Sequence, residues 1–118
     1  MAKQSNPDFL NGVPELLVLQ LLSRRAMYGY ELVRAIEQSS QQVLEFGEGC
    51  IYPVLHRLEK DGNLASRREE VGGRSRVVYR VTAKGRKRLD TQVAAWQRIA
   101  GAVQGILQGE QNGKPAIA

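Results

Sequence analysis

Apolar residues recur with helical spacing in the first part of the chain and predict two helices there. The stretch 15–23, ELLVLQLLS, is apolar on nearly every side, so a first helix opened by Pro14 is expected deep in a core. A second helix is predicted over residues 24–38, with Gly29 at its entry. One of its faces carries three core candidates: Tyr30, Val33 and Ile36. A polar connection over residues 38–47 follows.

A third apolar stripe surrounds a proline. Its members fall at i, i+3, i+4 and i+7 of one helical face: Ile51, Val54, Leu55 and Leu58. Because Pro53 has no N–H to donate, it fits without loss only in the first turn, and the helix is predicted to begin near Gly49 or Cys50. It is expected to end at residues 61–63 (DGN), where Gly62 suits a left-handed cap.

Beyond Leu64 the pattern changes from helical to strand-like. The runs LASRREE and SRVVYRV predict two strands joined through Gly72 and Gly73, which is a hairpin with a glycine tip. Tyr79 lies within the second, apolar run and is expected in the core. Thr82 then stands as the N-cap of a long last helix, residues 83–108.

Apolar residues of this last helix alternate at spacings of four and three: Leu89, Val93, Trp96, Ala100, Val103 and Leu107. The alternation is typical of a coiled-coil seam and predicts pairing with a second subunit, helped by Phe9, Leu10 and the first helix. An amphipathic helix that lies on its own domain is the alternative. Trp96, the only tryptophan, is either structural filler on the seam or a stacking wall for a flat ligand.

These elements predict a mostly α chain with a small β-hairpin, a winged helix-turn-helix plus a long C-terminal dimerisation helix. Residues 1–82 are expected to form the winged-helix DNA-binding domain with an N-terminal arm. Residues 83–108 would be the dimerisation helix, and residues 109–118 a flexible tail.

Composition narrows the class of protein. The 118 residues are 42% hydrophobic and 25% charged, which suits one globular domain. Apolar runs stop short of the roughly 18 residues of a membrane span, and the N-terminus lacks a signal-peptide core, so a cytoplasmic protein is expected. One cysteine and one histidine are too few for an intramolecular disulfide or a structural zinc site, and no cofactor is predicted. Cys50, at a helix start, is either a thiol of lowered pKa that senses oxidants or a replacement for a capping Ser or Thr.

Positive charge is concentrated between Arg57 and Arg88. This part of the chain holds 11 basic and 4 acidic residues, a net charge of +7, whereas the whole chain has +5 and the remainder therefore −2. Such a field suits a polyanion or an acidic membrane surface. A solvated basic surface is the alternative.

The opposite side of the third helix offers side chains that can read DNA. Residues near the start of a recognition helix reach base edges in the major groove. Tyr52 and His56 can each donate and accept hydrogen bonds there, and the Pro53 ring can pack on a thymine methyl. His56 is otherwise a bystander on the surface.

Other charged residues are predicted to contact the DNA backbone. Arg57 and Lys60 are better placed for phosphates, which carry no sequence information. The glycine tip lets the hairpin approach DNA closely, with Arg74 and Arg76 available for the minor groove or its flanking phosphates. Glu59, on the flank of the third helix, would repel phosphates and counts against DNA binding.

Three stretches are similar to the PadR-like family of transcriptional regulators: MYGYELVRAIE, CIYPVLHRLEKDGNL and GGRSRVVYRVTAKGRKRL. The match runs from about Pro14 to Leu89. The resemblance implies packing by Gly29 and Tyr30, Tyr52 and Pro53 in the recognition helix, Gly73 and Arg74 in the wing, and Thr82, Lys84 and Gly85 at the start of the last helix. The chain differs in Cys50, where the family usually has Ser or Thr, and it ends after one C-terminal helix, like the short subfamily.

The resemblance also implies a function. Members of the family look like homodimeric repressors released from DNA by small aromatic or cationic compounds. A sequence-specific DNA-binding transcriptional regulator is therefore expected, with an operator, a second copy of the chain and such an effector as partners. The alternative is a winged-helix protein-protein interaction module without DNA binding, although the basic run disfavours it because interface centres are usually depleted in Lys.

Two other functional classes fit the sequence less well. An enzyme is not expected, because there is no phosphate-cradling glycine motif and one histidine is too little to build a catalytic triad. RNA binding is disfavoured because the hairpin shows no aromatic stacking platform.

Overall fold

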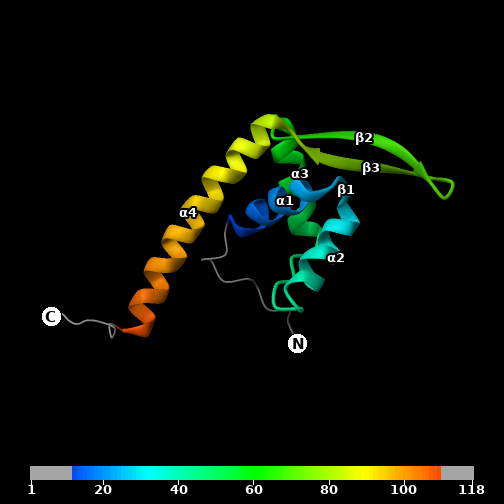
Figure 1. The fold of residues 1–118 in the computed structure, drawn as a ribbon. Helices are drawn as coiled ribbons and strands as arrows, with labels where there is room; N and C mark the ends of the chain where they lie inside the picture. Colours follow the sequence, from blue (N-terminus) through cyan, green and yellow to red (C-terminus); the bar gives the residue numbers. More distant parts are fainter. Residues whose placement is uncertain (1–11, 110–118) are drawn as a thin grey trace.

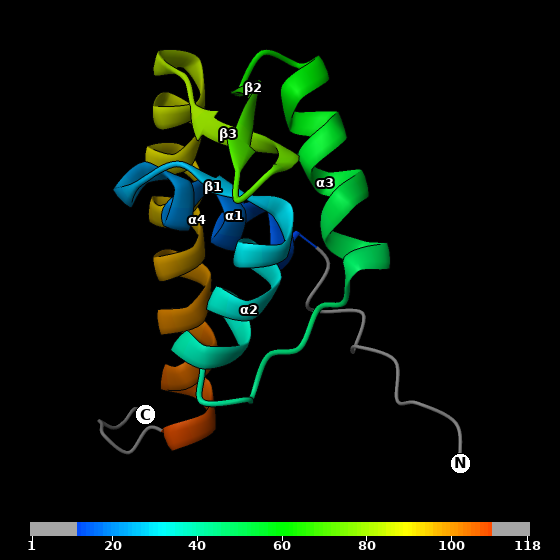
Figure 2. The same cartoon turned by 90° about the vertical axis from the view of Figure 1, so that its right-hand side faces the viewer.

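Seven elements follow one another in residues 12–109, the part of the chain that the computed structural model describes (Figure 1). They are α1 (Val13–Arg24), β1 (Met27–Tyr28), α2 (Gly29–Ser39), α3 (Glu48–Lys60), β2 (Leu64–Val71), β3 (Arg74–Val81) and α4 (Ala83–Gln108). Figure 2 shows α1 and α2 between α3 on one side and α4 on the other. The predicted fold class, a mostly α winged helix with a long C-terminal helix, is confirmed. Within these residues, no helix combines the length and the apolarity needed to cross a membrane.

α1 forms the centre of the core, as its apolar sequence predicts. Val18 and Leu19 are completely buried, in one cluster with Leu32 of α2 and Leu55 of α3. The segment between α2 and α3 is not the purely polar connection that was expected, because Phe46 is buried in this same cluster. Burying one such side chain contributes roughly 1.5–3 kcal/mol, so a single aromatic residue can anchor an otherwise polar segment.

The predicted hairpin is confirmed. β2 and β3 pair antiparallel along their whole lengths, and Tyr79 is buried in the core as expected. Gly72 and Gly73 form the two-residue turn with φ of 58° and 80°, a conformation that favours glycine. The wing is therefore a long ribbon that projects from the helices (Figure 1).

The second helix begins at Gly29, the residue predicted at its entry, and not at residue 24 where the predicted range started, because a short strand precedes it. Met27 lies opposite Tyr79 and Tyr28 opposite Val78, so β1 pairs with β3 and the sheet order is β1-β3-β2. α2 starts only at Gly29. A strand of two residues is too short to show alternating apolar and polar positions, so it could not be predicted from the sequence. Only its pairing with β3 identifies β1 as a strand.

Tyr30 is not a core residue, and this part of the expectation was wrong. Val33 and Ile36 are buried, whereas Tyr30 is 47% exposed and its hydroxyl accepts a hydrogen bond from Nη1 of Arg34 at 2.9 Å. Residues three apart in a helix drift by about 60° per step. Tyr30 is thus about 120° around the helix from Ile36, outside the buried stripe.

α3 begins earlier than predicted, and Pro53 lies in its second turn rather than its first. Gly47 is the N-cap and Glu48 the first helical residue. The N–H of Cys50 already donates to the carbonyl of Gly47 at 3.0 Å. Pro53 leaves the carbonyl of Gly49 without an intrahelical donor, and because Gly49 is exposed, water can reach that carbonyl.

α4 covers the predicted residues 83–108. Its N-cap is Thr82, as expected, whose Oγ1 accepts a hydrogen bond from the N–H of Gly85 at 3.1 Å. The helix leaves the base of the wing and its second half extends beyond the other helices (Figure 1). All residues from 101 to 108 are exposed among the described residues, so the end of the helix is not covered by the other described elements.

Candidate nucleic-acid interface

α3 has one buried face and one exposed face, as its pattern predicts. The buried face consists of Ile51, Val54, Leu55 and Leu58. The residues predicted to face DNA at i, i+3, i+4 and i+7 are all exposed: Pro53, His56, Arg57 and Lys60. Because that spacing places side chains on one side of a helix, the structure brings these four together on one surface.

Tyr52 lies between the two faces of α3. Its ring is half-buried against Gly29, where a Cβ atom would come within 2.5 Å of the ring. The ring centroid of Tyr52 is 6.4 Å from that of His56. Since only glycine leaves room for this ring, the pair holds the entry of α2 against α3.

Arg57 is paired with a buried carboxylate that was not among the predicted site residues. Glu15 of α1 is 6% exposed and accepts hydrogen bonds from Nη2 of Arg57 at 3.2 Å and from Nε of Arg88 at 2.6 Å, with Gln92 as a third donor. Burial would raise the pKa of Glu15, but the hydrogen bonds from Arg88, Gln92 and Arg57 outweigh it and the pKa is lowered. Glu15 thus connects α1 with both α3 and α4. The signal for it was a lone carboxylate in an apolar helix, since a glutamate is rarely buried unless it is paired.

The contact with Glu15 changes what Arg57 offers at the surface. Its side chain is 53% exposed and remains accessible, but its charge is partly neutralised within the protein. Lys60 has no ion-pair partner among residues 12–109. Its full charge is available to a phosphate.

The wing carries its two predicted DNA contacts in different settings. Arg74 is exposed next to the glycine tip. Arg76 is half-buried, with its guanidinium 4.5 Å from the centroid of the Tyr28 ring. The expected repulsion by Glu59 is weakened, because its carboxylate accepts a hydrogen bond from Oγ of Ser66 at 2.6 Å and therefore faces the hairpin.

Residues at the start of α4 hydrogen-bond to the turn after α3 and pack against it. Gly62 has φ of 82°, the left-handed conformation predicted for it. Oγ1 of Thr82 donates to the carbonyl of Gly62 at 2.7 Å, and Nζ of Lys84 donates to the preceding carbonyl at 2.6 Å. Gly85 packs so closely that a Cβ atom would lie 2.1 Å from the carbonyl oxygen of Asn63. This junction fixes the end of α3, the foot of the wing and the start of α4 relative to one another.

The predicted seam of α4 divides into two parts. Leu89 is buried in the core of its own chain and Val93 packs against that core, so the expectation that Leu89 faces a second subunit needs correction. The physical reason is that α4 passes α1 at this level and buries its first apolar turns there. Further along, Ala100 is half-buried, and Trp96, Val103 and Leu107 are exposed.

Two more apolar residues belong to the exposed part of α4. Ile99 and Ile106 are 54% and 80% exposed, and neither belongs to the predicted seam. Counting alternate steps of three and four from Trp96 would have found both, because the spacing then passes through Ile99, Val103 and Ile106. The candidates Phe9 and Leu10, the N-terminal arm and the tail beyond residue 109 lie outside the described residues.

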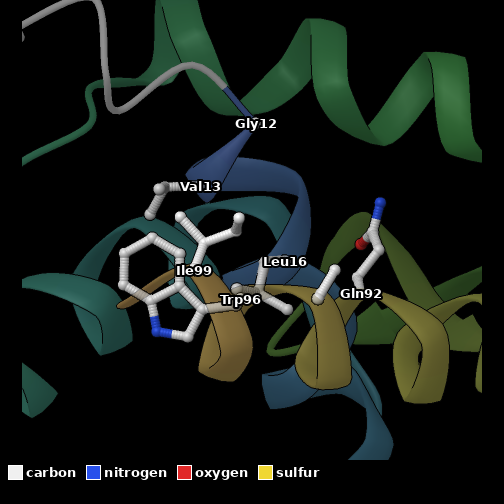
Figure 3. A pocket seen from close by; sticks show the side chains of 7 residues that line it. Gly12, Val13, Leu16, Gln92, Trp96 and Ile99 are labelled. Carbon is white, nitrogen blue, oxygen red and sulfur yellow. The ribbon is translucent and has the colours of Figure 1, made fainter. Parts of the chain in front are cut away.

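A hollow of about 310 Å³ lies beside Trp96, between the start of α1 and α4 (Figure 3). It is lined by Gly12, Val13, Leu16, Gln92, Ala95, Trp96 and Ile99. Figure 3 shows Trp96 and Gln92 at opposite ends of the group, with Leu16 between them. The walls are largely apolar, and Gln92 is also one of the donors to Glu15.

Cys50 matches neither of its two predicted roles. It is not the cap of α3, because the cap is Gly47. Burial raises the pKa of the Cys50 thiol and the positive charge of Arg57 offsets this only in part, so the thiol is not activated. Among residues 12–109, no three side chains of His, Cys, Asp or Glu come together in a way that could hold a metal ion.

Comparison with known proteins gives a consistent result. Residues 18–91 match the transcriptional regulator PadR-like family. A transcriptional regulator of Mycobacterium tuberculosis is 34% identical over 98 residues, which are 83% of this chain and 89% of the relative. The crystal structure of a PadR-like transcriptional regulator from Bacillus cereus superimposes with a TM-score of 0.76 at 30% identity, over 88% of this chain and all (100%) of that chain. The structure of a transcriptional regulator from Clostridium thermocellum superimposes with a TM-score of 0.77 at 26% identity, over 83% of this chain and 96% of that chain. Because sequence and fold agree over most of both chains, this chain belongs to the PadR-like family of transcriptional regulators.

Proposed function

We propose that this regulator is a homodimeric repressor in the cytoplasm, which binds a specific DNA operator and is released by a small effector. Membership of the family makes the chain a transcriptional regulator and implies DNA binding. Families of such regulators are generally not families of enzymes. Repression, dimerisation and the effector are the steps proposed here.

The observation that carries DNA binding is the exposed face of α3 at the foot of a basic wing. α3 is anchored through its opposite face, so it can enter a groove without uncovering the core. A major groove about 12 Å wide admits a helix. We assign base contacts to His56, to the ring of Pro53 and to the exposed edge of Tyr52, all in the first half to middle of the helix.

Backbone contacts are assigned to the cations around this face. Lys60 and Arg57 lie at the C-terminal end of α3, and Arg74 and Arg76 lie on the wing. Phosphate contacts hold the protein on DNA, and base contacts select the sequence. We therefore expect these four residues to determine affinity rather than specificity.

Dimerisation is proposed through the second half of α4. Its apolar side chains are between 47% and 80% exposed: Trp96, Ile99, Val103, Ile106 and Leu107. Together they would expose several hundred Å² of apolar surface, near the limit that a soluble monomer tolerates. A two-fold dimer would bury this face and would match paired half-sites about one DNA turn apart.

The effector site is proposed in the hollow beside Trp96. An exposed indole ring offers a stacking surface to a flat aromatic molecule and attracts a cation through its π-system. The position of the hollow next to the proposed dimer face would let a ligand influence the spacing of two subunits.

A winged-helix module that binds protein instead of DNA is the competing proposal. To separate the two, fragments of genomic DNA from the source organism would be selected on the purified protein and sequenced. We expect one enriched inverted repeat, which would support dimer and operator together. Enrichment of no sequence would reject sequence-specific DNA binding and favour the protein-interaction module.

A further inference from the structure

Two adjoining hollows lie between the entry of α2 and strand β3 of the wing, and both are lined by Tyr28, Tyr30 and Arg76. One has a volume of about 310 Å³ and reaches His56 on α3. The other has a volume of about 520 Å³ and reaches along β3 to Arg74. We call the two hollows together the tyrosine bay. It connects the base-reading face of α3 with the wing, and all four tyrosines of the chain line its first part.

The charge of the tyrosine bay is positive. Neither hollow has an aspartate or a glutamate among its lining residues. Arg76 has no ion-pair partner in the described part of the chain. The one carboxylate opposite it across the hairpin, that of Glu69, is bound by Arg67. The positive charge of the Arg76 guanidinium is therefore not neutralised by a carboxylate, and the guanidinium lies over the ring of Tyr28.

Tyr30 adds a second donor to the bay. Its hydroxyl accepts a hydrogen bond from Arg34 at 2.9 Å, and the Arg34 guanidinium lies 5.7 Å from its ring centroid. Because a phenol that accepts one hydrogen bond still has its own proton to donate, the O–H of Tyr30 can bind an anion. The exposure of Tyr30, which the sequence did not predict, makes this hydroxyl accessible to an anion.

We propose that the tyrosine bay holds a phosphodiester of the DNA backbone, bound by Arg76 and the hydroxyl of Tyr30, with the deoxyribose against the tyrosine rings. The proposal rests on the DNA binding proposed above. A backbone segment fits better than an isolated anion because the bay consists of two hollows that share Arg76, one reaching His56 and the other Arg74. A phosphate fixed there sets the position of His56 over the bases, although it reads no sequence itself.

The first test compares Arg76→Gln with Arg80→Gln. Arg80 is exposed on the same strand and lines neither hollow, so it is a matched control for the loss of charge. Each neutralised phosphate contributes about 0.9 to the slope of log K against log salt. Arg76→Gln is expected to lower this slope by about one per subunit and to weaken binding to the operator and to unrelated duplex by the same factor. Arg80→Gln is expected to leave the slope unchanged.

The second test compares Tyr30→Phe with the wild type. The substitution keeps the ring and removes only the proposed donor. It is expected to weaken binding to any duplex by at least about tenfold per subunit, the lower value of a hydrogen bond to a charged group. Circular dichroism and thermal unfolding of each variant confirm that it is folded.

The outcomes separate this proposal from the one it rests on. If the wild type binds no duplex, DNA binding itself is rejected. If the wild type binds with a steep salt slope while Arg76→Gln behaves like Arg80→Gln, the tyrosine bay and the backbone contact of Arg76 are rejected, and DNA binding itself stands. If inorganic phosphate shifts the tyrosine ring signals in NMR spectra but Arg76→Gln leaves DNA affinity intact, the bay takes a free anion and the proposal is also overturned.

Discussion

A carboxylate in an apolar core is stable only when its charge is met by donors, and Glu15 has three of them. We expect Glu15→Gln to lower the free energy of unfolding at neutral pH by about 2 kcal/mol, because hydrogen bonds to a charged acceptor are lost. The pKa of Glu15 is lowered in the folded state, so its contribution is complete above the ordinary value of 4.5 and is lost as the pH falls through the folded pKa. Chemical denaturation measures the free energy of unfolding of wild type and variant at several pH values from about 7 to about 3. The difference between the two proteins should disappear at the acid end.

The control for this prediction is Glu69→Gln. Glu69 pairs with Arg67 on the exposed wing, and such surface pairs are worth at most about 1 kcal/mol. A loss of stability as large for Glu69→Gln as for Glu15→Gln would contradict the special role of the buried carboxylate.

His56 tests whether the exposed face of α3 reads sequence. His56→Ala is expected to cost about 1–3 kcal/mol on the operator and less on unrelated DNA, because a base contact is made only with the preferred site. Lys60→Ala is the comparison, since a phosphate contact should weaken binding to both DNAs equally. Titrations of fluorescent duplexes measure all four affinities. Equal losses for His56→Ala on both duplexes would assign His56 to the backbone.

At the scale of elements, the junction between α3 and α4 depends on a glycine. Gly85→Ala would place a methyl group against the Asn63 carbonyl, and overpacking of this kind typically costs about 1–3 kcal/mol. Gly101→Ala is the control, because Gly101 is exposed with no neighbour within 4 Å of the added atom. In a helix that substitution should stabilise by about 0.5–1 kcal/mol. Thermal unfolding that moves in the same direction for both variants would show that the junction is not tightly packed.

The second half of α4 is the element on which the proposed dimer depends. The pair Val103→Glu and Ile106→Glu should give a monomer, because two charges on the proposed seam cannot be buried without partners. Gln104→Glu adds a charge beside them on the polar side of the helix and should leave a dimer. Light scattering measures the molar mass of both variants in solution and so distinguishes monomer from dimer. If the double variant is still a dimer, the interface lies elsewhere.

The whole molecule is extended for its size. Its dimensions are 65 × 42 × 21 Å and its radius of gyration is 17.5 Å, whereas a compact domain of about 100 residues has roughly 13 Å. Both the wing and α4 project from the helical core (Figure 1). A monomer of this shape leaves the apolar side of α4 in water, which favours the proposed dimer with two wings and two copies of α3.

The salt dependence of binding follows from this arrangement. Two subunits offer two copies each of Lys60, Arg74 and Arg76, or eight cations if Arg57 also leaves Glu15 for a phosphate. The slope of log K against log salt is then expected at about −5 to −7. Measurement on the selected operator over a range of potassium chloride concentrations provides the value. A slope near zero would contradict electrostatic binding altogether.

Features that depend only on neighbouring residues could be predicted from the sequence. The hairpin and its glycine tip, the end of α3 at Gly62, the Thr82 cap and the limits of α4 all follow from periodicity and turn chemistry within a few residues. The exposed face of α3 was predictable for the same reason. Its buried stripe lies within one short segment, so His56 and Lys60 on the opposite side had to face outward.

Features that join distant segments could not be predicted from the sequence, because they depend on how the chain folds. Glu15 meets partners 42 and 73 positions away, and β1 exists only through its pairing with β3. Leu89 followed the heptad pattern equally well for a core or for an interface, and the position of α4 against α1 assigned it to the core. Periodicity shows which side of an element is apolar but not what covers that side, because the covering element lies elsewhere in the chain.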